Sequence, residues 1–379
     1  MLVALAIVFG CVAQSLALNY SICREWSGHD FYDQFFWFNY DDPTHGLVDY
    51  VDQHTSRETN LSYVDPSTGR FVMKVDMGDP VPLHGNWSNM VRRSNRIHSK
   101  QWFEDGFYII KATRMPTGCG VWPAFWTSTG DQWPEGGEID IIEGVNGKGP
   151  NLSSLHTAKN CSIDARFNSS QLGNLERTDC AFQPGCASKY NDRLSFGHAF
   201  NNNGGGYFAL MRDTRVNGSG IGVYFWPNNV KPVDIPDQVA APPHKAPGTL
   251  DSDKMQKWGK PQAFFGYNDG SNTQCDLAKH FGKHQIIFDT TLCGTCAYHA
   301  TLQLTDRDEQ SQERHERVSC FVRRLFVKYV FLPSDIQTMD LNMQTHVGKL
   351  IMCGCTQTNA TRPMMTMTAP FLWSPRQRP

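Results

Sequence analysis

Three carboxylates, Glu138, Asp140 and Glu143, are separated only by isoleucines and are flanked on both sides by glycine. Side chains alternate faces along a β-strand, so Glu138 and Asp140 share one face, whereas strict alternation would turn Glu143 to the other. One extra residue, a β-bulge at Ile141 and Ile142, returns Glu143 to the carboxylate face. Because burying like charges together is unfavourable, this spacing predicts a functional cluster of acids rather than a solvated strand.

Two carboxylates that face one cleft are the groups that hydrolyse glycosidic bonds with retention. One attacks the sugar and the other carries a proton, and their carboxyl groups lie about 5–5.5 Å apart. Three tryptophans, Trp122, Trp126 and Trp133, precede the acids in the chain and offer ring faces on which sugars stack. The pattern predicts a carbohydrate site, and the alternative is an acidic strand edge beside a tryptophan-rich core.

The elements that position these acids are predicted to be β-strands. Short alternating or apolar runs dominate the chain up to residue 296, for example 70–76, 106–112, 221–226 and 284–289. Segments rich in Gly, Pro, Asn and Asp separate these runs, and no long helical periodicity appears. We therefore predict an all-β fold, a sandwich of two antiparallel sheets, with residues 18–296 as one domain.

The N-terminus predicts export. An apolar run over residues 2–10, followed by small residues, is typical of a signal peptide, here residues 1–17. This run is too short to span a bilayer, and no later segment is long and apolar enough to do so. Glycosylation acceptor patterns of the form Asn-x-Ser/Thr support a secreted glycoprotein and occur at Asn19, Asn60, Asn86, Asn151, Asn160, Asn168, Asn217 and Asn359.

The cysteines support the same compartment. Of the 12 in the chain, only Cys11 lies in the signal peptide, so the rest are expected mostly in disulfides with one left over. Cys180 and Cys186 are close enough to close one loop. Zinc is the competing interpretation at Cys293-x-x-Cys296 and Cys353-x-Cys355, but no second pair has consistent spacing, so we predict no metal. A net charge of −2 and the lack of a basic stripe argue against a nucleic-acid partner.

The character of the chain changes beyond residue 296. Residues 306–317 are a dense run of mixed charge, 339–367 are methionine-rich, and only 325–332 is typical of a strand. We predict an atypical tail over 297–379. Two alternatives stay open for it: residues 325–332 supply a strand that closes the sandwich, or the tail is disordered and foreign to the fold.

Two segments, Trp-Pro-Ala-Phe-Trp at 122–126 and Gly-Glu-Ile-Asp-Ile-Ile-Glu at 137–143, resemble glycoside hydrolase family 16, and within it the fungal endo-1,3(4)-β-glucanases or laminarinases. Further matching stretches are 42–46, 115–120, 155–157, 200–207, 275–276 and 291–294. The resemblance covers roughly residues 20–295 and implies a concanavalin A-like β-jelly-roll with a concave substrate cleft. The tail departs from it, because the family's closing Tyr/Trp-rich strand is not evident after residue 294.

The resemblance assigns roles to the three acids. It implies that Glu138 is the nucleophile, Glu143 the general acid/base, and Asp140 the residue that tunes them. Elementary electrostatics agrees, because Glu138 must be ionised while Glu143 holds a proton, and mutual repulsion helps to keep one proton on the pair.

The substrate-binding residues are expected to be Trp126, Trp133, His156, Arg96 and Trp122. For three of them a structural role is the alternative: His156 as a satisfied structural histidine, Trp122 as a core residue, and Arg96 in a surface salt bridge.

The function implied is that of an endo-hydrolase that cleaves β-1,3 or mixed β-1,3-1,4 bonds of β-glucan without a cofactor. The protein is expected to be a secreted monomer, either free or associated with the cell wall. The alternatives are a glucan transglycosylase that uses the same residues and a non-catalytic, lectin-like glucan-binding module. The preferred linkage depends on the shape of the loops that line the cleft.

Overall fold

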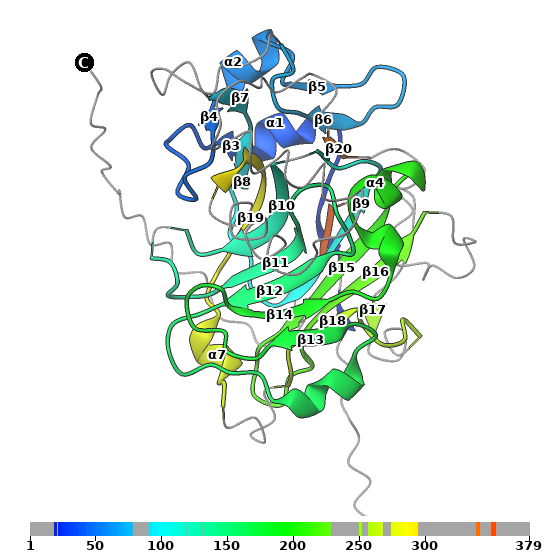
Figure 1. Ribbon diagram of the computed structural model, residues 1–379. Helices are drawn as coiled ribbons and strands as arrows, with labels where there is room; N and C mark the ends of the chain where they lie inside the picture. Colours follow the sequence, from blue (N-terminus) through cyan, green and yellow to red (C-terminus); the bar gives the residue numbers. More distant parts are fainter. Residues whose placement is uncertain are drawn as a thin grey trace, which may run out of the picture.

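The computed structural model describes residues 19–20, 22–78, 91–118, 120–130, 132–228, 250–251, 257–267, 274–294, 339–341 and 350–353. Two large antiparallel sheets form its centre, which confirms the predicted all-β sandwich (Figure 1). The predicted signal peptide and the candidate strand 325–332 lie outside the described residues.

The first large sheet has eight strands. In spatial order they are β13 (Asn174–Arg177), β14 (Cys186–Lys189), β12 (Leu152–His156), β11 (Glu138–Glu143), β10 (Val121–Ser128), β19 (Gln285–Leu292), β8 (Arg96–Ser99) and β3 (Phe35–Trp37). The strand with the three acids, β11, therefore lies near the middle, where neighbours on both sides fix its register.

The second large sheet has six strands. In spatial order they are β18 (Ala263–Phe264), β16 (Gly220–Pro227), β15 (Gly206–Asp213), β9 (Gly106–Ala112), β21 (Leu350–Cys353) and β2 (Ile22–Trp26). The β15–β16 ladder runs without interruption from Gly206↔Pro227 to Asp213↔Gly220. Strand β21 belongs to the predicted tail and pairs with both β9 and β2.

Smaller elements surround the two sheets. The short strands are β1 (Asn19–Tyr20) with β17 (Leu250–Asp251), β4 (Val48–Tyr50) with β7 (Arg92–Ser94), and β5 (Ser62–Val64) with β6 (Phe71–Met73) and β20 (Met339–Leu341). The helices are α1 (Asp30–Gln34), α2 (Gln53–Glu58), α4 (Gly197–Asn202), α7 (Leu277–His280) and the 3-10 turns η1 (Ala165–Ser170) and η2 (Arg193–Ser195). Figure 1 shows α1, α2 and β4–β7 gathered at one end of the sandwich and α7 toward the other.

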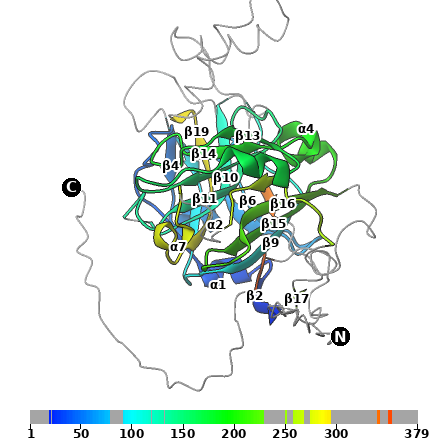
Figure 2. The same cartoon turned by 90° about the horizontal axis from the view of Figure 1, so that it is seen from below.

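The two large sheets lie against each other (Figure 2), and the apolar core takes residues from both. Alternation sends Ile139 of β11 and Phe125 of β10 inward, and both are fully buried. Phe208 and Ile110 of the second sheet belong to the same apolar cluster. Because one face of the first sheet is committed to this core, its opposite face is the one that carries the acids.

Two disulfides are described. Cys180–Cys186 closes the loop predicted from its spacing, and Cys161–Cys275 joins cysteines 114 residues apart in the sequence. Of the candidate zinc ligands, Cys296 and Cys355 lie outside the described residues. Within the described part of the chain, no helix is long and apolar enough to cross a membrane.

Candidate active site

The predicted bulge is present in β11. On the β12 side, Asp140 pairs with Ser154 and Glu143 with Leu152, so Ile141 and Ile142 together face a single residue. Pairing with β10 shifts at the same place, and both isoleucines are buried in the core. The extra residue therefore brings Glu143 to the face that carries Glu138 and Asp140.

Polar contacts draw the three carboxylates together. Ser154 Oγ donates to Asp140 Oδ2 at 2.7 Å and lies 3.4 Å from Glu143 Oε2. His156 Nε2 lies 3.2 Å from Asp140 Oδ2 and 3.9 Å from Glu138 Oε1. Asp140 thus stands between the two glutamates and shares one neighbour with each.

Burial makes these carboxyl groups hard to ionise. Desolvation, followed by repulsion from Asp140, raises the pKa of Glu138 to about 8 and that of Glu143 to about 7. Both glutamates are shifted in the same direction, so the cluster retains protons at pH values where an ordinary glutamate is ionised. The pKa directions alone do not distinguish a nucleophile from an acid.

His156 supplies the compensating positive charge. Burial by itself would lower its pKa, but the hydrogen bond to Asp140 and the charges of Asp140 and Glu138 outweigh burial and raise the pKa to about 10. Its Nδ1 bonds the Phe182 carbonyl at 2.8 Å, which fixes the ring. The imidazolium faces the acids, and both of its ring nitrogens have partners.

The three tryptophans all lie at the acids, although in different ways. The indole N–H of Trp122 donates to Glu143 Oε1 at 3.1 Å, which places this half-buried residue on the carboxylate face rather than in the core. Trp126 pairs across the strands with Asp140. Trp133 is 38% exposed, and its ring centroid lies 6.2 Å from that of His156.

Arg96 is buried on the same sheet, with 8% of its surface exposed, which rules out the surface salt bridge. Its guanidinium carbon lies 4.5 Å from the ring centroid of Phe38 and 5.0 Å from that of Trp126. Nε donates to His98 Nε2 at 3.0 Å, and burial, followed by the charge of Arg96, lowers the pKa of His98 to about 3. Arg96 therefore supports the Trp126 ring from within the sheet.

Sequence reasoning missed two members of this site, Ser154 and Asp289. Asp289 of β19 accepts the Trp126 indole N–H at 2.7 Å, and the hydroxyl of Tyr50 lies 3.3 Å from its other oxygen. Burial raises the pKa of Asp289 to about 6, against the opposing effect of Arg96. Because 163 residues separate Trp126 from Asp289, no local pattern could have linked them.

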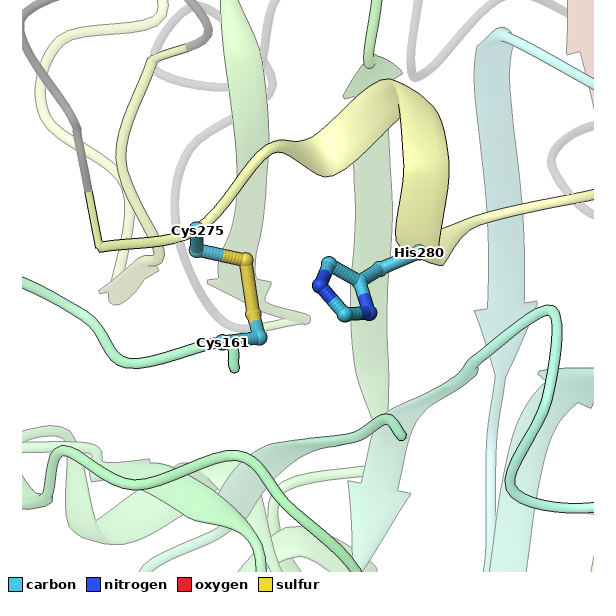
Figure 3. A group of neighbouring side chains, drawn as sticks. All are labelled: Cys161, Cys275 and His280. Carbon is cyan, nitrogen blue, oxygen red and sulfur yellow. A yellow bond between two sulfur atoms is a disulfide. The ribbon is translucent and has the colours of Figure 1, made fainter. Parts of the chain in front are cut away.

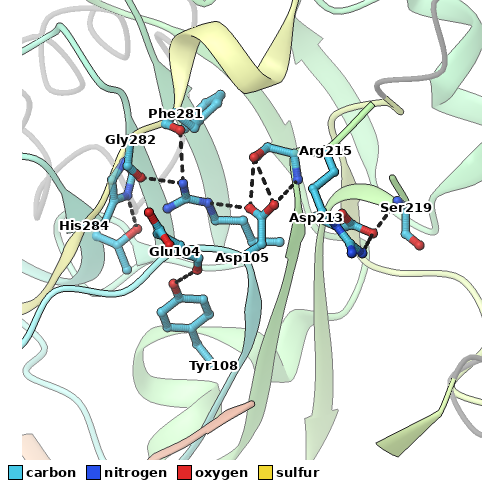
Figure 4. A network of polar contacts seen from close by, with 12 residues as sticks. Glu104, Asp105, Tyr108, Asp213, Arg215, Ser219, Phe281, Gly282 and His284 are labelled. Atoms are coloured by element: carbon cyan, nitrogen blue, oxygen red, sulfur yellow. Dashed lines mark hydrogen bonds and ion pairs between the residues drawn. The ribbon is translucent and has the colours of Figure 1, made fainter. Parts of the chain in front are cut away.

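Gly282 and His284, which belong to the polar network in Figure 4, fix the start of the acid strand. The Gly136 carbonyl accepts the backbone N–H of Gly282 at 2.9 Å and His284 Nε2 at 2.8 Å. Burial holds the pKa of His284 well below its usual range, so the neutral ring donates through Nε2. From the second sheet, Arg212 donates to the Phe281 and Gly282 carbonyls, which connects both sheets to this turn.

Gly137 completes this turn because a side chain would not fit there. Its φ is +83°, a conformation that favours glycine, and an added Cβ would lie 2.5 Å from the Phe281 ring.

Two groups of side chains have metal-ligand chemistry. Cys161, Cys275 and His280 lie together, but both sulfurs are joined in a disulfide and cannot act as thiolate ligands (Figure 3). Glu138, Asp140 and His156 offer atoms within 4.8 Å of one another. In this structure His156 forms ion pairs with Asp140 and Glu138.

Comparison with known proteins identifies the family. The model of the XgeA-like catalytic domain of family GH16 matches residues 35–324. The chain belongs to glycoside hydrolase family 16. This confirms the resemblance of the Trp-Pro-Ala-Phe-Trp and Glu-Ile-Asp-Ile-Ile-Glu segments.

Curated family 16 relatives are longer than this chain. A probable glycosidase of Schizosaccharomyces pombe is 37% identical over 287 residues, which cover 74% of this chain and 61% of that protein. The endo-1,3(4)-β-glucanase xgeA of Emericella nidulans is 32% identical over 300 residues, covering 78% of this chain and 43% of that protein. The chain thus spans less than two thirds of each.

Solved structures of the family support the jelly-roll fold. GH16 laminarinase 16A from Phanerochaete chrysosporium, solved with two β-glucans in donor and acceptor sites, has a TM-score of 0.68 at 31% identity and covers 89% of this chain and 100% of that one. An elongating GH family 16 β-1,3-glucosyltransferase has a TM-score of 0.67 at 28% identity, with 88% and 100% covered.

Proposed function

We propose that this family 16 protein is an endo-acting β-glucan hydrolase that cleaves β-1,3 or mixed β-1,3-1,4 bonds by a retaining double displacement. The observation that carries the proposal is the common face of Glu138, Asp140 and Glu143, with Asp140 contacting His156 and Ser154 between the two glutamates. The glucanase relatives and the glucan-bound laminarinase support β-glucan as the substrate.

Glu138 acts as the nucleophile in this proposal. The proposal places the negative charge on Glu138, 3.9 Å from the imidazolium of His156, and the shared proton on Glu143 when substrate is bound; in the free protein Glu138 has the higher pKa, about 8 against about 7 for Glu143. Attack of Glu138 on the anomeric carbon breaks the glycosidic bond while Glu143 gives its proton to the leaving oxygen. The products are a glycosyl ester on Glu138 and a shortened glucan.

The second step reverses these roles. Once Glu138 is a neutral ester, it no longer repels a charge on Glu143, so ionised Glu143 can accept a proton from water. The water oxygen attacks the anomeric carbon, the ester bond breaks, and Glu138 returns as a carboxylate. Asp140 keeps its contact with His156 throughout and holds the pair in position.

The tryptophans are proposed to bind sugar rings, with Trp126 and Trp133 as the main platforms. Trp126 contacts Arg96 and Asp289, and Trp133 is exposed beside His156. Trp122 is instead proposed to orient Glu143 through its indole N–H. We further propose that the protein is secreted, as the sequence of residues 1–17 predicts, and acts as a monomer.

The test is hydrolysis of laminarin, lichenan, agarose and xyloglucan, with Glu138→Ala as the inactive control. We expect new reducing ends from laminarin or lichenan, and the first-formed product, observed by proton NMR, in the β-configuration. Activity on agarose or xyloglucan alone would contradict β-glucan as the substrate. A first product in the α-configuration would contradict the retaining mechanism.

Transglycosylation is the second candidate, because the glucosyltransferase neighbour shares the fold at a similar TM-score. A sugar hydroxyl would then replace water in the second step. Products from laminari-oligosaccharides decide between the two: oligomers longer than the input would establish transfer, and shorter products alone would establish hydrolysis.

A further inference from the structure

Residues 151–153, Asn-Leu-Ser, match a glycosylation acceptor pattern, yet their polar side chains do not face solvent. Asn151 and Ser153 are both 0% exposed. Asn151 directly precedes β12, and Ser153 lies in β12 opposite the bulge of β11. The acceptor pattern at Asn151 is therefore buried in the folded chain.

These two side chains satisfy the backbone groups that the bulge leaves without ladder partners. The Ile141 carbonyl accepts Asn151 Nδ2 at 2.8 Å and Ser153 Oγ at 3.1 Å. In the opposite direction, the backbone N–H of Glu143 donates to Asn151 Oδ1 at 3.0 Å. A single amide group thus bridges the extra residue and the acid that follows it.

Buried partners fix the orientation of this bridge. The Asn151 backbone N–H donates to Ser195 Oγ at 2.9 Å, and its carbonyl accepts the Tyr190 N–H at 2.9 Å. Since Ser153 Oγ donates to Ile141, it accepts from the Tyr190 hydroxyl at 2.8 Å. Neither side chain can turn away without leaving buried polar groups unpaired, which is unfavourable.

We propose that Asn151 and Ser153 are positioning residues for Glu143, and that Asn151 carries no glycan in the active protein. The positioning role rests on the proposed function of Glu143. An Asn-linked glycan is attached through Nδ2, which here faces the Ile141 carbonyl inside the core, where a bulky sugar has no space. A chain modified at Asn151 before folding cannot build this bulge.

The kinetic test compares Asn151→Ala with Asn217→Asp, which removes an exposed acceptor pattern between β15 and β16 of the second sheet. We expect kcat on laminarin to fall about 100-fold in Asn151→Ala, because a small misplacement of a catalytic group has an effect of this size. KM should change less than about threefold, since the sugar platforms are untouched. Asn217→Asp should retain both parameters.

A second readout does not depend on turnover. Carbon-13 NMR titration of the Glu143 carboxyl should give a pKa closer to the ordinary glutamate value in Asn151→Ala, because a loosened strand end admits water. This pKa shift is expected even if the wild-type protein is inactive on every glucan. An inactive wild type with a shifted pKa in Asn151→Ala would therefore contradict the proposed function but not the positioning role. An unchanged Glu143 pKa in a folded Asn151→Ala protein would overturn the positioning role.

Ser153→Ala, matched with Ser219→Ala, keeps the test decisive if Asn151→Ala does not fold. Ser153→Ala removes one of the two donors to Ile141 and should shift the Glu143 pKa in the same direction by less, whereas Ser219→Ala should not. Peptide mapping of protein secreted from a eukaryotic host should find Asn151 unmodified in the active fraction. A glycan there in active protein, or an unshifted Glu143 in Ser153→Ala, would contradict the proposal.

Discussion

The two ends of the acid strand are held by different kinds of contact. At the Glu138 end, the Gly136 carbonyl is fixed by a backbone N–H and by the neutral ring of His284, in a turn that Arg212 connects to the second sheet. At the Glu143 end, the contacts come from side chains of the adjacent strand, above all Asn151. The first end is fixed by the sandwich as a whole, whereas the second depends on one neighbouring segment.

This difference matches the two roles proposed for the glutamates. A nucleophile must hold one position against the anomeric carbon, and a turn anchored to both sheets provides it. An acid/base must change its protonation state twice in each cycle, and its pKa depends on the few groups around it. The comparison predicts that changes at the two ends will have separable effects.

The largest effect is expected from Glu138→Gln. The amide cannot form the glycosyl ester, so kcat on laminarin should fall by roughly 10⁴–10⁶-fold, as for other nucleophile replacements. Residual activity should show no covalent intermediate by mass spectrometry. A loss smaller than tenfold would show that Glu138 is not the attacking group.

Glu143→Gln is expected to lose about 10²–10⁴-fold on laminarin, the range typical of general acid–base catalysis. The leaving group of an activated aryl β-glucoside needs no protonation, so Glu143→Gln should still form the glycosyl ester from this substrate at close to the wild-type rate. Added azide, which attacks the ester without a base, should then restore turnover in Glu143→Gln. The rescued product should be a β-glycosyl azide, and a β-glycosyl azide formed by Glu138→Gln instead would reverse the assignment of the two ends.

Stability should fall as pH rises, because folding raises the pKa of the two glutamates and of His156. The folded state binds these protons more tightly than the unfolded chain, so their contribution is greatest at acid pH. The His156 contribution is complete below its unfolded pKa of about 6.5 and is lost as pH rises toward its folded value of about 10. His156→Gln should flatten the pH dependence of the unfolding free energy over this window, as measured by urea denaturation.

The smallest expected effect on activity comes from His284→Ala, which tests the end that the sandwich holds. Loss of a buried hydrogen bond should lower stability by about 1–3 kcal/mol, while the Gly282 bond keeps Gly136 in place. We expect kcat to fall less than about tenfold and the Glu143 pKa to stay as in the wild type, unlike in Asn151→Ala. If His284→Ala and Asn151→Ala shifted the Glu143 pKa equally, the Glu138 and Glu143 ends of the strand would not be held independently.

Local periodicity was sufficient to predict the acid face and its bulge. The alternation of the strand, and the one extra residue between Asp140 and Glu143, are visible within six residues. The two-sheet fold followed from the same alternation repeated along the chain. The roles of Glu138 and Glu143 remain predictions that kinetics must test.

Other parts of the site could not be read from the sequence, since their partners are distant. Asp289 reaches Trp126 only through the β10–β19 pairing, and Cys161 finds Cys275 across 114 residues. Asn151 shows the opposite difficulty, because a short pattern with a familiar meaning has another role once buried. The tail posed a third problem, since β21 has no strong alternation yet pairs with β9 and β2.

The register around the bulge has a consequence for insertions and deletions, which are usually tolerated only in loops. Ile141 is paired with no residue of β10 or β12, whereas Ile142 pairs with Phe125 of β10. The flanking pairs Asp140↔Ser154 and Glu143↔Leu152 are regular. Deleting Ile141 would therefore preserve the registers on both sides and leave strict alternation, with all three acids still on one face. The shorter strand would lack the carbonyl that Asn151 and Ser153 bind, so replacing those residues should matter far less in that background. We therefore expect that deleting Ile141 and replacing Asn151 or Ser153 will be tolerated when the changes are combined, and that replacing Asn151 or Ser153 alone will impair the protein.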